Sequence, residues 1–174
     1  TGRAVWAPIN TNTRLLHIGV AATHRTPKTH WEDGAYRIST RSHSAVNRKK
    51  FLDTDDMFDV DNVFGYTFEL AGKYNGIMFQ GEYKGHNVNM IEGENASFNG
   101  YYVQTAYLLW GGNHNYNKNE GEFTRITPGS DKGDLELALR YDFIDLNDFA
   151  FRLNLKNHVA INGNCLKNLQ IFLH

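Results

Sequence analysis

The stretch AYRISTRSHS, residues 35–44, contains three polar side chains whose types and spacing suit the binding of an anion. Arg37, Ser39 and Arg41 occupy every second position, so in a β-strand they share one face. Four residues of strand separate the two arginines by about 13 Å. A guanidinium group is always charged, and its planar fork matches the oxygens of phosphate. The spacing predicts a wall on which an anion passes from one arginine to the next; the alternative is two surface arginines paired with nearby acids.

Other cations could attract anions toward such a wall. Arg48, Lys49 and Lys50 follow one another in NRKKFLDTDD, where their long-range field would gather phosphate and would weaken with salt. The acids that follow at 53–56 oppose this field, so a hairpin with internal ion pairs is an equal alternative. Two further candidates lie on the polar faces of predicted strands, with acids near them: Arg25 and Arg140.

Enzymatic and metal chemistry are not indicated. The eight histidines are scattered, with no pair at the spacing of a metal site. The acidic run 53–61 lacks the central glycine and the distal glutamate of an EF-hand loop. No phosphate-binding glycine loop or nucleophile elbow is present. We therefore expect no enzymatic activity, no catalytic residues, no cofactor and no metal.

The elements that must position these residues are β-strands. In GDLELALRYDFIDLND, residues 133–148, leucines and aromatics occupy every second position and charges or alanine lie between them. Such a strand has one apolar and one polar face. The apolar face meets a protein core in a soluble sandwich or barrel, and lipid in an outer-membrane barrel. The same alternation recurs in 16–25, 64–73 and 77–84, with further strands expected at 101–110, 153–161 and 169–173.

The connections between the predicted strands are of two kinds. Asn75-Gly76 is a strong signal for a tight hairpin turn. Polar segments at 23–34, 85–100 and 111–123 are expected to be long loops. Short turns at one end and long loops at the other are typical of outer-membrane barrels. We predict an all-β antiparallel meander of about eight or nine strands in a single domain, residues 1–174.

Composition agrees with this class and excludes others. Eighteen Lys and Arg nearly balance nineteen Asp and Glu, which argues against a nucleic-acid partner. No segment approaches the roughly 20 apolar residues of a spanning helix. Cys165 is the only cysteine and has no local nucleophile signature. The sequence starts at Thr1 without a charged and apolar leader, so we expect that any signal peptide lies outside it.

Six blocks in order resemble one known family. They are GRAVWAP, AYRISTRSHS, RKKFLDTDD, GYTFELAGKYNGIMFQGEY, GYYVQTAYLLWGG and GDLELALRYDFIDLND. In order and spacing they are similar to the porin O and P family, the phosphate-selective outer-membrane porins, and the chain resembles its carboxyl-terminal half. The tail departs from the family, because Gly163, Asn164 and Cys165 stand where a tryptophan and a tyrosine are expected and the sequence ends at His174.

The resemblance implies a transmembrane β-barrel, or the carboxyl-terminal half of one, in the bacterial outer membrane. It implies passive diffusion of anions such as phosphate, contact with outer-membrane lipid, a homotrimer, and a ladder of arginines to which Arg37 and Arg41 would belong. Two alternatives stay open: a soluble ligand-binding β-barrel, and a truncated barrel with a structural or interaction role.

Overall fold

The protein is all-β. The computed structural model describes residues 1–27, 36–41, 50–54, 56–146 and 165–173, and the account below is confined to them. Within these ranges the strands are β1 (Gly2–Asn10), β2 (Arg14–Arg25), β3 (Ser39–Arg41), β4 (Lys50–Asp53), β5 (Val60–Tyr74), β6 (Ile77–Met90), β7 (Ala96–Leu108), β8 (Tyr116–Asn117), β9 (Glu122–Phe123), β10 (Glu136–Asp145) and β11 (Cys165–Leu173).

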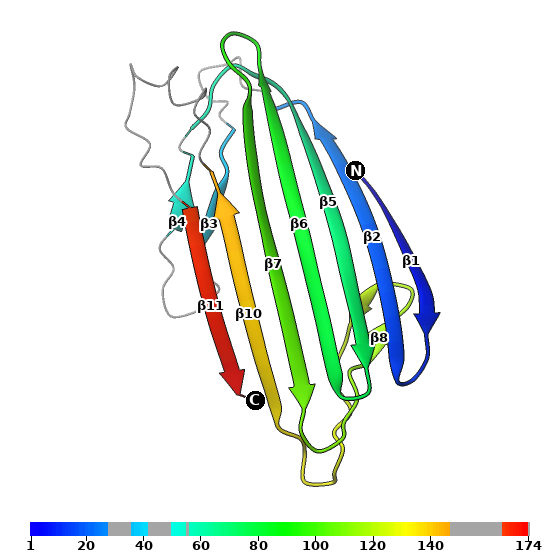
Figure 1. Ribbon diagram of the computed structural model, residues 1–174. Helices are drawn as coiled ribbons and strands as arrows, with labels where there is room; N and C mark the ends of the chain where they lie inside the picture. The colour runs from blue at the N-terminus through cyan, green and yellow to red at the C-terminus, as the bar shows by residue number, and fades with distance from the viewer. Residues whose placement is uncertain (28–35, 42–49, 55, 147–164, 174) are drawn as a thin grey trace.

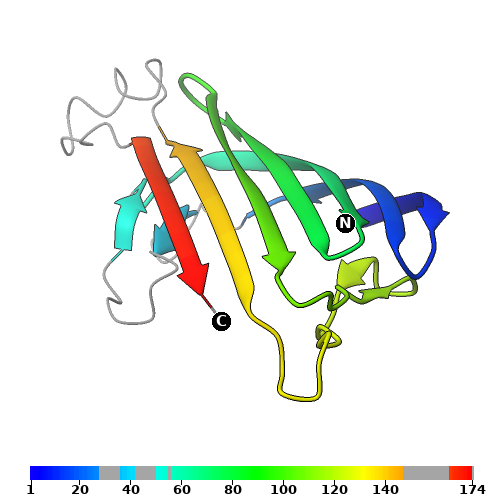
Figure 2. The ribbon, with the colours of Figure 1, turned by 60° about the horizontal axis from the view of Figure 1, so that its bottom comes forward.

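Seven strands form one antiparallel sheet in the order β1-β2-β5-β6-β7-β10-β11 (Figure 1). The pairs β3-β4 and β8-β9 form two separate two-stranded sheets. The large sheet is curved and is not closed, since β1 and β11 lie at its two edges (Figure 2). The predicted meander is confirmed, with seven strands in the main sheet of the described residues rather than eight or nine.

The alternation predicted from the sequence separates the two faces of this sheet. On β10, Leu137 and Leu139 are 46% and 42% exposed, whereas Ala138 and Asp142 are 7% and 6% exposed. Most of the apolar residues predicted to share a face on β2, β5 and β6 are exposed in the same way, among them Ile18, Phe68 and Ile77. The leucine face is therefore the outer, convex face of the sheet, and the polar side chains point to the concave side.

The turn between β5 and β6 is as predicted. Tyr74 pairs with Ile77, so Asn75 and Gly76 form the two-residue connection. Asn75 has a φ of 52°, in the left-handed region that asparagine adopts more readily than most residues.

The expectation of a long loop at 85–100 is wrong. The strand β6 continues to Met90 and β7 begins at Ala96, so only 91–95 connect them. Backbone ladder bonds do not require apolar side chains, and the polar residues here pair across strands: Ser97 donates to Asn87 at 3.0 Å and Asn89 to Asn62 at 2.8 Å. Asparagine is depleted in strands generally, which is why the sequence suggested a loop.

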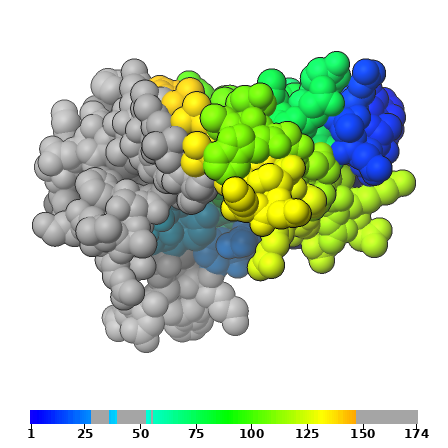
Figure 3. Space-filling view, turned by 90° about the horizontal axis from the view of Figure 1, so that it is seen from below, coloured from blue at the N-terminus to red at the C-terminus, as the bar shows by residue number. Residues whose placement is uncertain are grey.

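The loop that joins β7 to β10, residues 109–135, lies at the same end of the sheet as the tight turn at 75–76, with β8 and β9 near its middle (Figure 1). The sequence predicts short turns at one end of the sheet and long loops at the other. This prediction is wrong for the loop 109–135, because it shares an end with the short turn at 75–76. In Figure 3, viewed from this end, the yellow and yellow-green atoms of this loop lie beside the blue amino-terminal hairpin. The loop folds onto the concave face, where Arg3 of β1 donates to the carbonyl of Glu120 at 2.9 Å.

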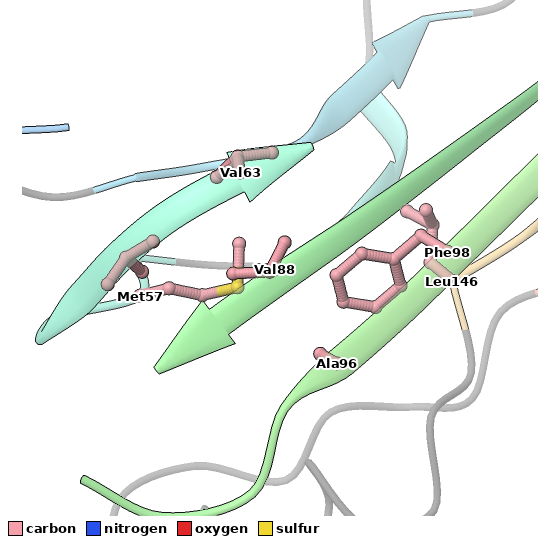
Figure 4. Close-up of a cluster of buried hydrophobic side chains, with 7 residues drawn as sticks. Met57, Val63, Val88, Ala96, Phe98 and Leu146 are labelled. Carbon is pink, nitrogen blue, oxygen red and sulfur yellow. The ribbon is translucent and has the colours of Figure 1, made fainter. Parts of the chain in front are cut away.

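A hydrophobic cluster fills the concave side at the opposite end. Met57, which follows β4, packs with Val63, Val88, Phe98 and Leu146 from the large sheet (Figure 4). Tyr36 and Ile38, which precede β3, pack against the same cluster. The segment that carries the predicted arginine wall is therefore anchored on the inner side of the large sheet.

Two other predicted strands have different outcomes. Residues 153–161 lie outside the described part of the chain. Residues 169–173 belong to β11, whose pairing with β10 runs from Leu137↔Leu173 to Asp145↔Cys165.

Candidate functional site

The concave face holds a continuous set of charged and polar side chains, which we call the inner wall. Its members come from six neighbouring strands, β1, β2, β5, β6, β7 and β10, because alternate residues of each strand point inward. Across the sheet, His17 pairs with Ala71, Glu69 with Glu82, and Gln80 with Gln104, so that these inward positions form rows. The members used below are Arg3, His17, Arg25, Glu69, Lys73, Gln80, Glu82, Lys84, His86, Tyr102, Gln104, Arg140 and Asp142.

Arg140 is held on three sides. Its Nε and Nη2 donate to the Asp142 carboxylate at 3.0 and 2.8 Å, and Nη1 donates to Gln104 at 3.1 Å. Its guanidinium carbon lies 3.9 Å from the centre of the Tyr102 ring, a cation-π contact. The charge of Arg140 is therefore neutralised by Asp142 within the wall. For this residue the structure contains the ion pair with a nearby acid that was the alternative to anion contact.

A second network joins the wall to the loop 109–135. Arg3 forms a bidentate pair with Glu69, with Nε to Oε1 at 2.9 Å and Nη2 to Oε2 at 2.7 Å. The buried His17 lies between Glu69 and the loop, with Nε2 3.3 Å from Glu69 Oε2 and Nδ1 2.6 Å from the Tyr116 hydroxyl. Burial raises the pKa of Tyr116. The loop is thus fixed to β1, β2 and β5 by hydrogen bonds and charge.

The ammonium group of Lys73 connects three segments of the chain by hydrogen bonds. Its ammonium donates to the carbonyls of Asn12 and His114, at 2.9 and 2.7 Å, and to the Asn113 side chain at 3.2 Å. His114 Nε2 lies 3.1 Å from the Gly76 carbonyl. Burial lowers the pKa of His114. Lys73 is therefore a structural cation, and its donors are directed to the protein rather than to the open side.

The loop has its own organising residue, Asp134. Its carboxylate accepts four backbone N–H groups, each at 2.9 Å, from Trp110, Gly112, Gly129 and Leu135. Burial opposes ionisation of this carboxyl, but the four hydrogen bonds outweigh it, and the pKa of Asp134 is lower than its ordinary value. The Asp134 side chain thus holds the two ends of the loop together.

Two cavities open along the inner wall. One of about 410 Å³ lies between Ile38 and the strands β6, β7 and β10, with Lys84, His86, Tyr102 and Arg140 in its lining. The other, of about 330 Å³, lies between the wall and the loop, with Arg3, Glu69, Gln80 and Tyr116 in its lining. Both have charged groups of each sign at their surface.

The predicted arginine wall is only partly described. Arg37 precedes β3 and makes a bidentate pair with Asp53, with Nε and Nη2 each 2.6 Å from a carboxylate oxygen, and Nη1 lies 3.3 Å from Asp56. Ser39 and Arg41 lie in β3, which is paired with β4 rather than with the large sheet. Beside this pair, Tyr36 and Met57 form an isolated antiparallel β-bridge. A role for Arg37, Ser39 and Arg41 in anion contact stays a prediction.

The weaker candidates are distributed as follows. Arg48 and Lys49 lie outside the described residues, and Lys50 is the first residue of β4. Arg25 ends β2, on the inward row. Sequence reasoning missed Arg3, and it missed the link from His17 to Tyr116, because β1 alternates only weakly and a loop gives no period. The aromatic and histidine residues within the polar stretch 113–116 were the available signal.

Two negative findings complete the site. The described residues contain no helix long and apolar enough to cross a membrane. In the same part of the chain, no three His, Cys, Asp or Glu side chains gather in a way that could hold a metal ion.

A curved antiparallel sheet with an apolar outer face and a charged inner face is the architecture of a porin-type β-barrel, of which these residues form part. Comparison with known proteins identifies the group. The family model described as "Phosphate-selective porin O and P" matches residues 1–166, and the chain belongs to this family. The chain is also similar to an uncharacterized protein of Caulobacter vibrioides, with 31% identity over 155 residues. That match covers 84% of the chain but only 30% of the relative, so the chain spans less than a third of that protein.

Proposed function

We propose that the protein containing this chain is a pore of the bacterial outer membrane through which anions, phosphate among them, diffuse passively. The main support for the proposal is the distribution of residues over the two faces of the sheet. Apolar residues are exposed on the outer face and charged residues lie on the inner face, in a member of the phosphate-selective porin family. Lipid would contact the outer face, and the inner wall would line a watery passage.

The soluble ligand-binding barrel is not favoured by any observation. Such a barrel directs its apolar faces inward, whereas Val103 and Leu139 are exposed on the convex side. A trimer remains an expectation from the family.

In this proposal the anion is guided by fixed charge and bound weakly enough to leave. Arg37, Ser39 and Arg41 are proposed contacts, with Arg48, Lys49, Lys50, Arg25 and Arg140 as weaker contributors to the field. Arg37 already shares its guanidinium with Asp53 and Asp56. An anion at this position would therefore compete with carboxylates, which favours brief contact over tight binding. Arg140, bonded to Asp142, would act through the field alone.

The test is ion selectivity in planar bilayers, with the full-length protein that contains this chain. We expect a reversal potential that indicates anion preference, and a chloride current that phosphate reduces. Replacing Arg37 and Arg41 together by alanine should weaken the block by phosphate. Arg14→Ala is the matched control, because Arg14 lies at the start of β2 beside the Tyr74 ring on the outer face. A cation-selective wild-type pore, or no conductance, would contradict the proposal.

A further inference from the structure

The outer face of the large sheet changes from apolar to polar near the end opposite the turn at 75–76 (Figure 1). On β5, Phe64 is exposed, and the next outward residue toward this end is Asn62. On β7, the exposed Tyr101 is followed in the same direction by Asn99. The strands β6 and β10 change at neighbouring positions. The polar outward residues beyond this change, which we call the outer collar, are Asn62, Asn87, Asn89, Ser97, Asn99 and Asp145.

Strand pairing places the collar on the outer face. Val88 and Ala96 pair with each other and are buried in the inner hydrophobic cluster. The adjacent pair, Asn87 and Ser97, therefore points outward, and both residues are exposed. The Ser97 hydroxyl donates to Asn87 Oδ1 at 3.0 Å. The collar is thus a hydrogen-bonded wall that continues the apolar outer face beyond its aromatic edge.

The apolar band below the collar has the height of the hydrocarbon layer of a membrane. On β5, the outward residues Tyr74 and Phe64 are ten positions apart, which is about 33 Å along a strand. At a tilt of about 40°, this length corresponds to a depth of about 25 Å, the apolar height of an outer-membrane barrel. A barrel seated in lipid by this band therefore has the outer collar at the level of the lipid headgroups.

The side chains of the collar are mainly uncharged. Amides and a hydroxyl make up all but one of its members, Asp145, and it contains no lysine or arginine. Within the described residues, Asn99 makes no side-chain hydrogen bond, and the amide nitrogen of Asn87 has no acceptor. The turn beside the collar carries the exposed acids Glu92 and Glu94, which would repel an anionic headgroup. An amide both donates and accepts hydrogen bonds, which is what sugar hydroxyls require of a partner.

We propose that the outer collar binds the sugar head of a glycolipid in the membrane leaflet at this end of the barrel. Asn87 and Asn99 exchange hydrogen bonds with the sugar hydroxyls. Tyr83 and Tyr101, which pair across β6 and β7 just below the collar, pack against the sugar ring and the first carbons of the acyl chains. This inference rests on the part of the proposed function that places the outer face in lipid, and it concerns the partner of that face rather than the pore.

The test is lipid retention by the full-length protein that contains this chain, measured by native mass spectrometry. The protein is folded in micelles that contain equal amounts of diglucosyl diacylglycerol, phosphatidylglycerol and phosphatidylcholine. The glycolipid should be retained about threefold or more over either phospholipid, the effect of one or two hydrogen bonds. Asn87→Ala with Asn99→Ala should remove this preference. Asn119→Ala is the control and should keep it, because Asn119 is an exposed asparagine of the loop at the other end of the sheet.

A second variant covers the case in which the double variant does not fold. Asn99→Lys adds a cation to the collar, so it should raise the retention of phosphatidylglycerol toward that of the glycolipid and leave phosphatidylcholine unchanged. Equal retention of the three lipids by the wild type would overturn the glycolipid site. A wild-type preference for phosphatidylglycerol, or a glycolipid preference unchanged in both collar variants, would overturn it as well.

Conductance separates this inference from the proposed function. An anion-selective pore that retains the three lipids equally would remove the glycolipid site and leave the function. A glycolipid preference that requires Asn87 and Asn99, in a protein without anion conductance, would retain the site and remove the function.

Discussion

The two faces of β7 and β10 are made by the same twenty-three residues and meet different surroundings. On the outer face, Val103 and Leu139 are 56% and 42% exposed and make no polar contact. On the inner face, Arg140 bonds to both Gln104 and Asp142. A soluble sheet has the opposite arrangement, with its apolar face covered.

Alternation along a strand therefore does not by itself reveal which face is buried. Pairing between strands satisfies the backbone N–H and C=O groups whichever face is in water. The same strands can therefore form a sheet with the apolar face inside or outside. Here the polar residues determine which face lies inside. Their hydrogen bonds can be completed only on the concave side, where neighbouring strands and the loop 109–135 converge. The predictions that follow disturb one face or the other.

The largest effect is expected from a charge on the outer face. Val103→Arg near the middle of β7 should destabilise the folded barrel in lipid by about 2–4 kcal/mol, because a cation there must enter the hydrocarbon layer. Gln80→Arg is the matched control, since Gln80 lines the cavity that Glu69 and Glu82 also line. Urea unfolding in lipid vesicles measures both. Equal destabilisation by the two variants would show that the outer face does not meet lipid.

A smaller effect is expected from breaking the inner network. Arg140→Met removes one partner of the nearly buried Asp142 and should cost about 2 kcal/mol, less than for a fully buried pair because a cavity adjoins it. Adding Asp142→Leu should restore most of this stability, since the carboxylate that lost its bonds to Arg140 is removed as well. Both are measured by the same unfolding assay. A double variant less stable than the single one would contradict the ion-pair interpretation of Arg140.

The smallest effect is expected in the loop. Asp134→Asn should leave the sheet intact but speed amide exchange at Gly112 and Gly129 about tenfold, because a carboxylate holds these N–H groups more strongly than an amide does.

The pH dependence of the loop has a definite sign. The pKa of Asp134 is lowered by folding, so its contribution is present above the unfolded value, about 4, and is lost as the pH falls through the lower folded value. Fluorescence of Trp110, whose N–H is bonded to Asp134, would report this loss below about pH 4. A signal change centred near pH 6 would point to a histidine instead.

The sequence predicted most strands of the sheet but not the side-chain contacts of the inner wall, for physical reasons. Period-two patterns in 64–73, 77–84 and 133–148 reflect local geometry, and the two-residue turn at Asn75-Gly76 reflects a local backbone preference. The extent of β6 and β7 was missed because Asn87 and Asn89 resemble loop residues until their cross-strand partners are known.

The contacts of the inner wall depend on pairing between distant segments. Arg3 lies 66 residues from Glu69, and His17 lies 99 residues from Tyr116, so no local pattern announces either contact. Arg25 and Arg140 both alternate onto the inward face, but only the register of β7 and β10 brings Gln104 and Tyr102 to Arg140.

Cysteine labelling along β7 tests most directly that the apolar face meets lipid and the polar face meets water. Single cysteines at positions 100–107 would be introduced into the full-length protein with Cys165→Ala, folded in lipid vesicles, and exposed to a charged, water-soluble maleimide. We predict alternation, with labelling at 100, 102 and 104 and protection at 101, 103 and 105. Labelling of the odd positions with protection of the even ones would contradict this assignment of the two faces.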